Sequence, residues 1–465
     1  MDTTLTLTAE QHSALRNHLF PEDGCEAVAI ALCGRRPGPM RHRLVVHRLL
    51  LIPYETCSVR KPDRVTWPTE VLIPCLDEAS KKGMAIVKIH GHRAYDRFSS
   101  VDDVSDKALF PSIYAWVGDS EPHASAIVLD DGRMFGRVVD EHGTFRPLVS
   151  INVVGDDLTF WHTTEGLSHV PAHAMRIAQA FGEGTFMRLR KLRIAVIGCS
   201  GTGSPVIEQL ARNCVGTLVL VDPDIVEAKN LNRILNTGMK DAVAGRTKVD
   251  VAKASIERMG LGTKVETYAK NLFDPEVVKA VAGCDVVFGC MDTVDGRHLL
   301  NKLATFYLLP YFDLGVRLDS DGNGGVDQVC GTVHYLKPGG SSLLSRGVYN
   351  LEQVRAAGLF RSNPAAYKAL LKEGYIRGIH EDRPAVIQLN TMIASFAVNE
   401  LLARLHPYRI DPNCDFAIHR ISLSHGIYEH EADGLPCPTL VRHVGRGDVQ
   451  PLLDWAELST MSTAA

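Results

Sequence analysis

Short apolar runs separated by polar and turn-forming residues mark the first third of the chain. Runs of five to nine residues predict strands, and they fall at 27–32, 44–52 and 85–89. Between the second and third runs, residues 68–82 have the spacing of an amphipathic helix. Further runs predict a closing set of strands at 132–135, 137–139 and 148–154. These patterns predict a compact α/β unit over residues 24–150, preceded at 1–19 by a polar segment of helical pattern.

From residue 192 the rhythm changes to strands that alternate with longer helical segments. Strands are predicted at 193–198, 217–222 and 285–290, with a helix starting near residue 205. Because a strand, a helix and the next strand form a parallel crossover, this order predicts a mostly parallel sheet. A long helix is predicted over 384–405. We therefore divide the chain into a first domain, a connector, a second domain and an irregular C-terminal segment, at 1–155, 156–187, 188–430 and 431–465.

The composition is that of a globular protein with more than one domain. The chain has 465 residues, of which 45% are hydrophobic and 22% charged. These values are close to the globular average, and the length suggests two or three domains. The 50 Lys and Arg residues against 54 Asp and Glu give a formal net charge of −4. This balance argues against a broad nucleic-acid-binding surface.

The cysteines and the start of the chain indicate the compartment. The 11 cysteines are scattered and form no Cys-x-x-Cys pair, which is typical of reduced thiols rather than a disulfide framework. Residues 1–19 lack the basic segment and apolar run of a signal peptide. No run of 18 apolar residues predicts a membrane span. We expect a cytoplasmic protein that binds neither membranes nor nucleic acid.

Two histidines end one predicted strand of the first domain. His90 and His92 lie two positions apart, so both imidazoles face the same side of the strand. The sequence Phe-Ser-Ser-Val-Asp-Asp follows at 98–103. A His-x-His pair with one carboxylate offers three ligands to Zn²⁺ and leaves a fourth position for water. Glu26, at the start of the first strand, is the candidate base for that water, and a nearby serine is a candidate donor to the oxyanion.

This set resembles the JAMM (MPN/JAB) metallopeptidases, whose pattern is an upstream Glu, His-x-His, about seven residues, Ser, two residues and Asp. The resemblance covers roughly residues 20–150 and implies a JAMM-type mixed α/β domain with a catalytic Zn²⁺. Two assignments of the last pair stay open, namely Ser99 with Asp102 or Ser100 with Asp103. Gly91 and Arg93 stand where the family usually has Ser and Pro. The non-catalytic interpretation treats the histidines as surface residues and the acidic cluster as the start of a helix.

A glycine-rich turn follows the first strand of the second domain. The sequence Gly198-Cys199-Ser200-Gly201-Thr202-Gly203 leads into the next helix. Such a turn lets backbone N–H groups and the helix N-terminus approach phosphates. Asp222 ends the next strand, where an acid suits a ribose hydroxyl. On these residues alone, a dinucleotide-binding dehydrogenase fits equally well.

The residues that follow favour a nucleoside triphosphate over a dinucleotide. Arg233 and Lys248 are cations that can balance a triphosphate. Asp292, after the strand at 285–290, can hold Mg²⁺. A dehydrogenase would give these three side chains no role, so the dehydrogenase interpretation is disfavoured.

This region looks like the ThiF/MoeB and ubiquitin-activating-enzyme family over about residues 172–430. The family pattern is Gly-x-Gly-Gly-x-Gly, Asp-x-Asp-x-Val, Asn-Leu-x-Arg, a Lys and a late Asp. It corresponds here to Gly198, Gly201, Gly203, Asp222, Asp224, Asn230, Arg233, Lys248 and Asp292. Arg176 matches the family arginine that reaches the ATP of the partner subunit. The resemblance implies a Rossmann-like adenylation domain that takes ATP and Mg²⁺ and works as a homodimer.

The chain departs from this family at its cysteines. Many relatives hold a structural zinc with two Cys-x-x-Cys pairs, but residues 338–345 carry serines instead and 414–417 carry one cysteine. That structural zinc is therefore expected to be absent. In relatives that form a thioester, the cysteine precedes the long helix, and residues 374–384 contain none. Cys330 and Cys437 are the remaining candidates for a thioester, and a buried structural thiol is the commoner role.

Together the two resemblances imply one class of substrate. A JAMM hydrolase cleaves after the C-terminal glycine of a ubiquitin-like protein, and a ThiF-type enzyme activates that same carboxyl group with ATP. The expected function is a bifunctional prokaryotic enzyme that processes or deconjugates a ubiquitin-like protein and adenylates its C-terminus, with a conjugating enzyme or a sulfur donor as a further partner. Two alternatives stay open: adenylation of a sulfur-carrier protein for biosynthesis, and a first domain that only docks the partner.

Overall fold

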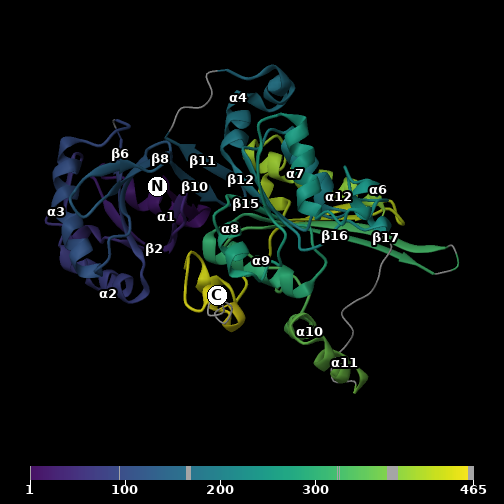
Figure 1. Cartoon of the computed structure of the whole chain (residues 1–465). Coiled ribbons are helices and arrows are strands. Elements are labelled where there is room, and N and C mark those ends of the chain that lie inside the picture. Colours follow the sequence, from purple (N-terminus) through teal and green to yellow (C-terminus); the bar gives the residue numbers. More distant parts are fainter. Residues whose placement is uncertain are drawn as a thin grey trace. The chain divides into compact units, whose positions relative to one another are not determined.

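The computed structural model describes residues 2–93, 95–163, 169–321, 323, 325–373 and 386–458. Its chain forms two compact units (Figure 1). The first unit comprises Met1–Gly166, Phe306–Leu308 and His443–Ser459. The second comprises Leu167–Thr305, Leu309–Arg442 and Thr460–Ala465. Each unit has its own sheet and its own helices, which is the arrangement of a mixed α/β protein.

The first unit is built on a nine-stranded sheet in the order β11-β10-β1-β3-β2-β6-β7-β8-β9. Its strands are β1 (Asp2–Thr8), β2 (Val28–Arg36), β3 (Arg41–Leu51), β6 (Ala85–His92), β7 (His123–Leu129), β8 (Met134–Val139), β9 (Phe145–Pro147), β10 (Ser150–Val154) and β11 (Leu158–His162). A small ribbon is made by β4 (Val59–Lys61) and β5 (Arg64–Thr66). The central strand β2 runs antiparallel to both β3 and β6, and β6 runs parallel to β7.

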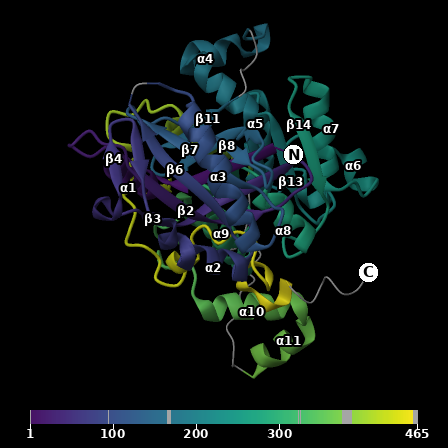
Figure 2. The same cartoon turned by 90° about the vertical axis from the view of Figure 1, so that its left-hand side faces the viewer.

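Helices cover both faces of this sheet, which explains its unbroken apolar runs. One core joins α1 (Ala9–Leu19) to the alanines of β2, and the other joins α2 (Ile73–Lys82) and α3 (Ser100–Val117) to Val28, Ile30 and Leu32. Figure 2 shows α1, α2 and α3 around the sheet strands. Alternate residues of β2 therefore belong to opposite cores, and every residue of the strand is buried.

The start of the chain differs from its predicted helix. Residues 2–8 form β1, which pairs in parallel with both β3 and β10, and only Ala9–Leu19 is helical. The alternation of Thr with Leu at 3–8 suits a strand because β-branched residues pack well on a pleated sheet. Thr8 ends the strand and caps the helix, with its hydroxyl accepting from the backbone N–H of Gln11.

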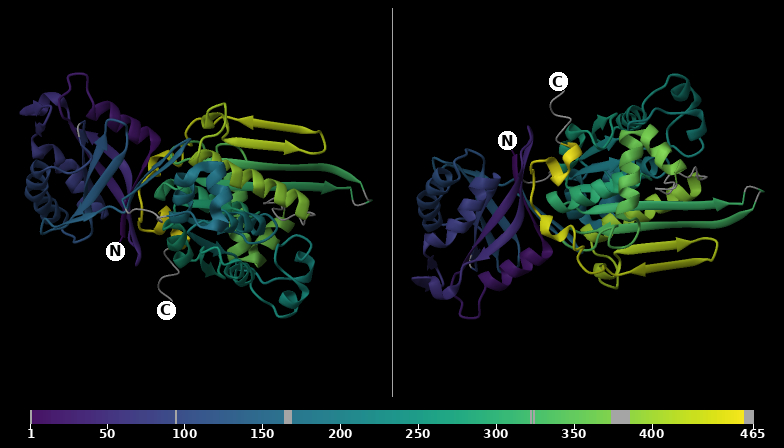
Figure 3. Two further views of the ribbon diagram at one scale, coloured as in Figure 1. Left: turned by 90° about the horizontal axis from the view of Figure 1, so that it is seen from above. Right: turned by 90° about the horizontal axis from the view of Figure 1, so that it is seen from below.

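The second unit is built on an eight-stranded sheet in the order β14-β13-β12-β15-β16-β17-β18-β19. Its strands are β12 (Arg193–Ile197), β13 (Thr217–Val221), β14 (Lys264–Tyr268), β15 (Val286–Gly289), β16 (Tyr311–Ser320), β17 (Val326–Leu336), β18 (Ile418–Ser422) and β19 (Ile427–Glu431). Pairing is parallel from β14 to β16 and antiparallel beyond it. The predicted parallel sheet is thus half of a mixed one. Figure 3 shows the two antiparallel hairpins side by side.

Helices of the second unit follow the strands as the crossover pattern predicts. They are α4 (Met175–Lys191), α5 (Gly203–Arg212), α6 (Met239–Val243), α7 (Lys248–Met259), α8 (Pro275–Ala282), α9 (Val294–Tyr307), α10 (Leu351–Ser362), α11 (Pro364–Lys372) and α12 (Ile387–Leu405). The long helix α12 packs against α5 and against β16 and β17. The segment without a thioester cysteine, 374–384, lies outside the described residues. Among the described residues, no helix has the length and hydropathy needed to span a membrane.

The predicted C-terminal segment at 431–465 does not form one separate piece. Within the first unit, residues 445–448 of this segment are hydrogen-bonded to β2. The backbone N–H of Gly34 donates to the carbonyl of Gly445, and that of Asp448 donates to the carbonyl of Arg35, at 3.1 and 2.7 Å. Part of the segment that the sequence predicts as irregular is therefore hydrogen-bonded to a buried strand.

Candidate functional site

His90 and His92 lie at the carboxyl end of β6, where the strand leaves the sheet. Both side chains point to the face covered by α3, and each residue is only 4% exposed. Their Nε2 atoms are 3.1 Å apart, and their rings meet edge to face at 4.9 Å between centroids. The Nδ1 atom of each ring is buried without a hydrogen-bond partner in the described part of the chain.

Asp102 completes this cluster from the first turn of α3. Its Oδ1 lies 2.9 Å from the Nε2 of His90, and its Oδ2 lies 3.4 Å from the Nε2 of His92. Ser99 is the N-cap of the helix and donates its hydroxyl and its backbone N–H to the same Oδ2, at 2.8 and 2.7 Å. Burial opposes ionisation, but hydrogen bonds from the two histidines hold the pKa of Asp102 well below its ordinary range.

The two assignments left open by the sequence separate in the structure. Asp102 faces the histidines, whereas Asp103 points away and pairs with Arg137, with Nη1 to Oδ1 at 2.5 Å. Ser100 is solvent-exposed, whereas Ser99 contacts Asp102. The physical reason is the helix cap: the third residue after an N-cap turns its side chain back to the cap, and that residue is Asp102. The placement of Asp103 and Ser100 in the cluster is therefore corrected.

Glu26 lies two residues before β2, the strand that neighbours β6. Val28 pairs with His90 in the antiparallel register of β2 and β6, and two further residues bring Glu26 to the level of His92. The backbone N–H of Glu26 donates to the carbonyl of Lys61 at 2.9 Å. Burial raises the pKa of Glu26 to about 7, with the charge of His92 opposing this shift.

The donor set of this cluster fits a zinc ion. The ligand atoms of His90, His92 and Asp102 all lie within 4.8 Å of one another. Two imidazole nitrogens and one carboxylate oxygen are the three ligands that many catalytic zinc sites use. Because neither Nδ1 atom has a partner, each ring is free to carry its proton there and to present the Nε2 lone pair to the cluster.

The glycine-rich turn between β12 and α5 is too crowded for side chains. A Cβ at Gly203 would lie 1.8 Å from the carbonyl oxygen of Gly198, and a Cβ at Gly201 would lie 2.3 Å from the Nδ2 of Asn390. Gly198 itself has a φ of 89°, and a Cβ there would lie 2.6 Å from the oxygen of Cys290. The backbone of the turn is thus packed against itself and α12, as in a loop that approaches a phosphate closely.

Asp222 follows β13 and is hydrogen-bonded to the glycine-rich turn. Its Oδ2 accepts from the backbone N–H of Cys199 at 2.7 Å, and its Oδ1 accepts from the N–H of Asp224 at 2.9 Å. Burial raises the pKa of Asp222, and the charge of Lys248 opposes the shift. The side chain thereby links the end of β13 to the turn that follows the neighbouring strand β12.

Lys248 begins α7 and faces both acids of the Asp-x-Asp sequence. Its Nζ lies 2.7 Å from the Oδ2 of Asp224 and 3.6 Å from the Oδ1 of Asp222. The helix is capped by Thr247, whose hydroxyl accepts from the backbone N–H of Asp250. A buried cation is therefore held beside the predicted ribose-binding acid.

The remaining predicted residues of the second unit divide between buried and exposed positions. Asn230 is buried, and its Oδ1 accepts from the backbone N–H of Glu227 at 3.2 Å. Arg233 donates to the carbonyl of Lys229, and its Cδ lies beside Gly201. Asp292 is exposed after β15. The structure thus brings Arg233 to the turn and leaves Asp292 open to solvent at the end of a parallel strand.

Arg176 is exposed on α4, away from the glycine-rich turn in sequence. Its Nη1 donates to Oε1 of Gln179 at 3.1 Å. The helix is interrupted six residues later at Gly182, where φ is 79° and ψ is 152°. The predicted arginine therefore lies on the first segment of a kinked helix, on its solvent side.

Sequence reasoning missed the charged residues that support these sites. Arg297 on α9 is half-buried against the buried Asp313, with Nε to Oδ1 at 3.2 Å, and Asn390 covers Gly201 from α12. In the first unit, Lys88 and Arg137 are buried beside α3. Of these residues, only Lys88 could have been identified from the sequence, because it stands two positions before His90 and so faces the same side of the strand.

The two cysteine candidates differ in accessibility. Cys437 is 2% exposed, and its Sγ lies 3.2 Å from the hydroxyl of Thr439. Burial raises the pKa of this thiol, but hydrogen bonds from Ser342 and Thr439 outweigh it and leave the pKa below its ordinary value. Cys330 is half-buried on β17. A thiol as enclosed as Cys437 cannot attack an acyl group without movement of its surroundings.

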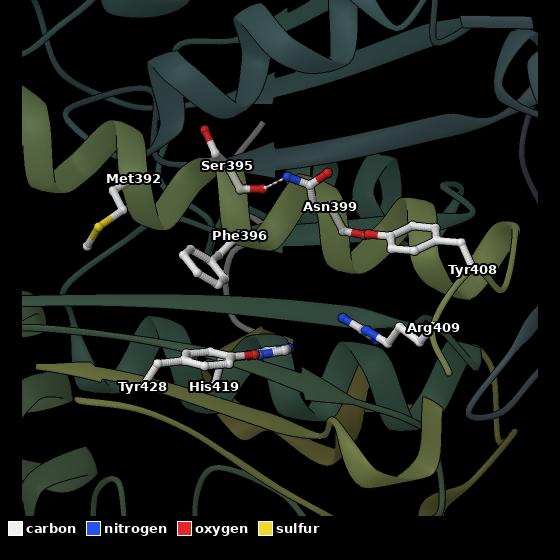
Figure 4. A pocket seen from close by; sticks show the side chains of 8 residues that line it. All are labelled: Met392, Ser395, Phe396, Asn399, Tyr408, Arg409, His419 and Tyr428. Carbon is white, nitrogen blue, oxygen red and sulfur yellow. Dashed lines mark hydrogen bonds between the residues drawn. The ribbon is translucent and has the colours of Figure 1, made fainter. Parts of the chain in front are cut away.

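An open pocket of about 270 Å³ lies between α12 and the hairpin of β18 and β19 (Figure 4). Its lining is aromatic and polar and consists of Met392, Ser395, Phe396, Asn399, Tyr408, Arg409, His419 and Tyr428. His419 is already engaged, with Nε2 2.7 Å from the buried Glu400 and Nδ1 3.0 Å from the hydroxyl of Tyr428. None of the predicted site residues lines this pocket.

Comparison with known proteins shows which protein family the second unit matches. Residues 173–422 match the ThiF family model. The chain is 38% identical over 115 residues to the adenylyltransferase and sulfurtransferase MOCS3 of Sus scrofa, covering 25% of each chain. It is 36% identical over 123 residues to the SAMP-activating enzyme E1 of Haloferax volcanii, covering 26% of this chain and 45% of that one. It is 27% identical over 166 residues to the ubiquitin-like modifier-activating enzyme 5 of Drosophila willistoni, covering 33% and 38%.

These relatives are each matched over less than half of their length. The family model, by contrast, spans more than half of this chain and includes the glycine-rich turn, both acids of the Asp-x-Asp sequence, Arg233 and Lys248. The chain belongs to the ThiF family.

Proposed function

We propose that the chain is a bifunctional enzyme that acts on the C-terminus of a ubiquitin-like protein. The second unit adenylates the terminal carboxylate with ATP, and the first unit hydrolyses the bond that follows the terminal glycine. The observation that carries the proposal is the convergence of Asp222, Asp224 and Lys248 beside a glycine-rich turn of a ThiF-family chain. Two relatives, an adenylyltransferase and sulfurtransferase and a ubiquitin-like modifier-activating enzyme, support the reaction class.

In the adenylation step, the terminal carboxylate oxygen attacks the α-phosphorus of ATP, and the bond to the β-phosphate oxygen breaks. Pyrophosphate leaves, and the product is an acyl-adenylate. Asp222 accepts a hydrogen bond from a ribose hydroxyl, and Lys248 and Arg233 balance the charge on the triphosphate. Asp292 would hold Mg²⁺, which when bound supplies positive charge to balance the departing pyrophosphate. The reaction needs positioning and charge balance, which these residue types supply.

In the hydrolytic step, His90, His92 and Asp102 would hold Zn²⁺. The metal, when bound, supplies Lewis-acid chemistry and a water of lowered pKa. Glu26 would accept a proton from the attacking water at its carboxylate as the C–O bond forms, and would then pass it to the departing amine as the C–N bond breaks. Ser99 fixes the start of α3, and for it to donate a hydrogen bond to the oxyanion its hydroxyl would have to turn away from the Oδ2 of Asp102.

The proposed assembly is a homodimer. Arg176 lies exposed on its helix and pairs only locally, with Gln179, among the contacts described for it. In the proposed dimer its guanidinium reaches the triphosphate bound by the partner subunit. A long, permanently charged side chain suits this task because it can bind phosphate oxygens in a bidentate manner.

A second candidate function is favoured by the match to an adenylyltransferase and sulfurtransferase. In that case sulfur, rather than an amine, attacks the acyl-adenylate, and the product is a thiocarboxylate on a sulfur-carrier protein. The enclosure of Cys437 weakens the case for a thioester on this chain. The two outcomes are distinguished by the mass of the modified partner, because a thiocarboxylate and a lysine conjugate have different masses.

The adenylation half is tested by pyrophosphate exchange into ATP. The probe is a recombinant ubiquitin-like protein ending in Gly-Gly and encoded beside this chain, with a des-Gly form of the same protein as control. Exchange that requires the intact diglycine end is expected. Exchange with neither protein, under conditions in which ATP binds, would overturn the adenylation proposal.

A further inference from the structure

Three charged side chains outside the proposed ligand set hold α3 against the sheet. Lys88 lies on β6 and faces the same side as His90, and its Nζ is 2.5 Å from the Oδ1 of Asp106. Arg137 reaches Asp106 from β8, with Nη2 to Oδ2 at 2.7 Å and Nε to Oδ2 at 3.2 Å. Asp106 is fully buried, and Lys88 and Arg137 are almost so. This group is the ion cluster below.

The ion cluster repeats the contacts of the proposed metal site one helical turn further along. Asp102 meets the histidines, and Asp106, four residues later, meets Lys88, which is two residues before His90. Four residues of helix rise about 6 Å and two residues of strand about 6.7 Å, so the two steps match. The Lys88–Asp106 contact therefore sets the height of α3 on β6, and with it the height of Asp102.

Arg137 also holds the segment that leads into the helix. Its guanidinium lies between two aromatic rings, 3.8 Å from the centroid of Phe98 and 3.6 Å from that of Phe145. Its Nη1 binds Asp103. Phe98 precedes the N-cap Ser99, and Asp103 follows Asp102, so this one side chain contacts the chain on both sides of the Ser99–Asp102 pair.

The histidines have no such support of their own. The Nδ1 atoms of His90 and His92 have no hydrogen-bond partner among residues the structure describes. Ligand histidines usually donate that second N–H to a carboxylate or carbonyl, which sets the ring. Here the orientation of the three ligand side chains depends more on Asp102, the third ligand, and on the residues that hold Asp102 in place.

We infer that Arg137 is a positioning residue for the metal site: through Asp103, Asp106 and Phe98 it holds Asp102 at the height and angle that zinc binding requires. The inference rests on the proposed zinc site. It concerns Arg137, which lies 45 positions after His92 in the sequence. A lysine at this position would keep the charge but lose the forked hydrogen bonds and the stacking between two rings.

The test is the zinc affinity of the full-length protein, measured by competition with a chromophoric chelator. Arg137→Gln is expected to weaken zinc binding about 10- to 100-fold, the range seen when groups that orient metal ligands are removed. Arg137→Lys should recover part of this loss. Phe98→Leu removes one stacked ring but no charge and should give a smaller loss.

The matched control is Ile113→Ala, which opens a cavity under the same helix three turns from the ligand. Ile113 is buried against α2 and the sheet and touches no member of the ion cluster by any described contact. It should destabilise the first unit while leaving zinc affinity within about threefold of the wild-type value. Cobalt-substituted protein provides a second readout, because the visible spectrum reports a changed ligand geometry.

The outcomes are distinguishable. A wild-type protein that binds no zinc overturns the proposed hydrolytic function itself. Zinc binding in the wild type together with an unchanged affinity in Arg137→Gln overturns the positioning role. If Arg137→Gln does not fold, Arg137→Lys and Phe98→Leu decide: affinities equal to those of the wild type and of Ile113→Ala would overturn the inference.

Discussion

The Nζ of Lys248 lies 2.7 Å from the Oδ2 of Asp224, two residues beyond the acid that is hydrogen-bonded to the glycine-rich turn. This ion pair links α7 to the end of β13 and holds a nearly buried cation beside Asp222. In the proposed reaction, the same cation balances the triphosphate. The contact therefore stabilises the fold and also keeps the lysine in place to bind the triphosphate.

Replacing Lys248 should therefore lower adenylation, and it should also cost stability, because it leaves the buried Asp222 without its cation. We expect Lys248→Ala to lower pyrophosphate exchange about 100- to 1,000-fold, the effect of removing one group that stabilises developing charge. Lys240→Ala is the matched control, because Lys240 is an exposed lysine of the neighbouring helix α6. Equal exchange rates for the two variants would remove Lys248 from the proposed triphosphate site.

The packing of the glycine-rich turn predicts a sharp difference between two Gly→Ala substitutions. Gly203→Ala would place a Cβ 1.8 Å from a carbonyl oxygen and should cost about 1–3 kcal/mol of unfolding free energy and lose exchange activity. Gly184→Ala on α4 meets nothing within 4 Å and should stabilise the helix by about 0.5–1 kcal/mol. Denaturant unfolding measures both, and a Gly203→Ala protein as stable as wild type would contradict the described turn.

The histidine cluster predicts that metal binding and adenylation are separable. His90→Ala removes one of three ligands and should abolish stoichiometric zinc and hydrolysis while leaving pyrophosphate exchange unchanged. His142→Ala is the control, since that side chain is 81% exposed in a turn. Metal analysis of dialysed protein decides the matter. Stoichiometric zinc in His90→Ala would place the ion elsewhere.

Acid should weaken the second unit through Glu400. This carboxylate is fully buried beside Arg404, Arg409 and His419. Burial opposes its ionisation, but hydrogen bonds and charge from His419 and the arginines lower the pKa of Glu400 to about 2 from an ordinary 4.5. A carboxylate with a lowered pKa stabilises the fold fully above its ordinary value and loses that contribution as the pH falls towards 2.

Thermal unfolding between pH 6 and pH 2 measures this effect. Glu400→Gln should be less stable than wild type near neutral pH, by about 3–5 kcal/mol for a broken buried pair, and the difference should shrink as the pH falls. A difference that is constant over this range would show that the ionised form of Glu400 does not stabilise the fold.

Sequence patterns predicted the strands whose burial is complete and failed where tertiary contacts decide. The runs at 85–89 and 193–198 are unbroken because helices cover both faces of the sheet. The pattern predicts a helix where the structure has the strand Asp2–Thr8, because the threonines make this segment polar although it lies inside the sheet. The apolar pattern does not predict the helix Ser100–Val117, because buried acids interrupt its apolar face: Asp102 faces the histidines, and Asp106 faces Lys88 and Arg137.

The sites show the same division. The order of His90, His92 and a downstream acid could be read from spacing, as could the Asp-x-Asp sequence and Lys248. The choice of Asp102 over Asp103 could not, because it depends on which residue caps the helix. Arg137 and Arg297 were missed because their partners lie on other elements, 31 and 16 residues away in the case of Asp106 and Asp313.

Intact-mass measurement of one partner protein tests the central claim most directly. The probe is a ubiquitin-like protein carrying a short extension after its diglycine, incubated with the zinc-loaded chain and then with ATP and Mg²⁺. The account predicts loss of the extension, leaving a terminal glycine, followed by an adenylate on that glycine. It further predicts that Lys248→Ala blocks only the adenylation, whereas Glu26→Gln blocks both changes on the extended probe but still adenylates a probe made without the extension. An extension that stays intact, or a mature end that never gains the adenylate, would contradict it.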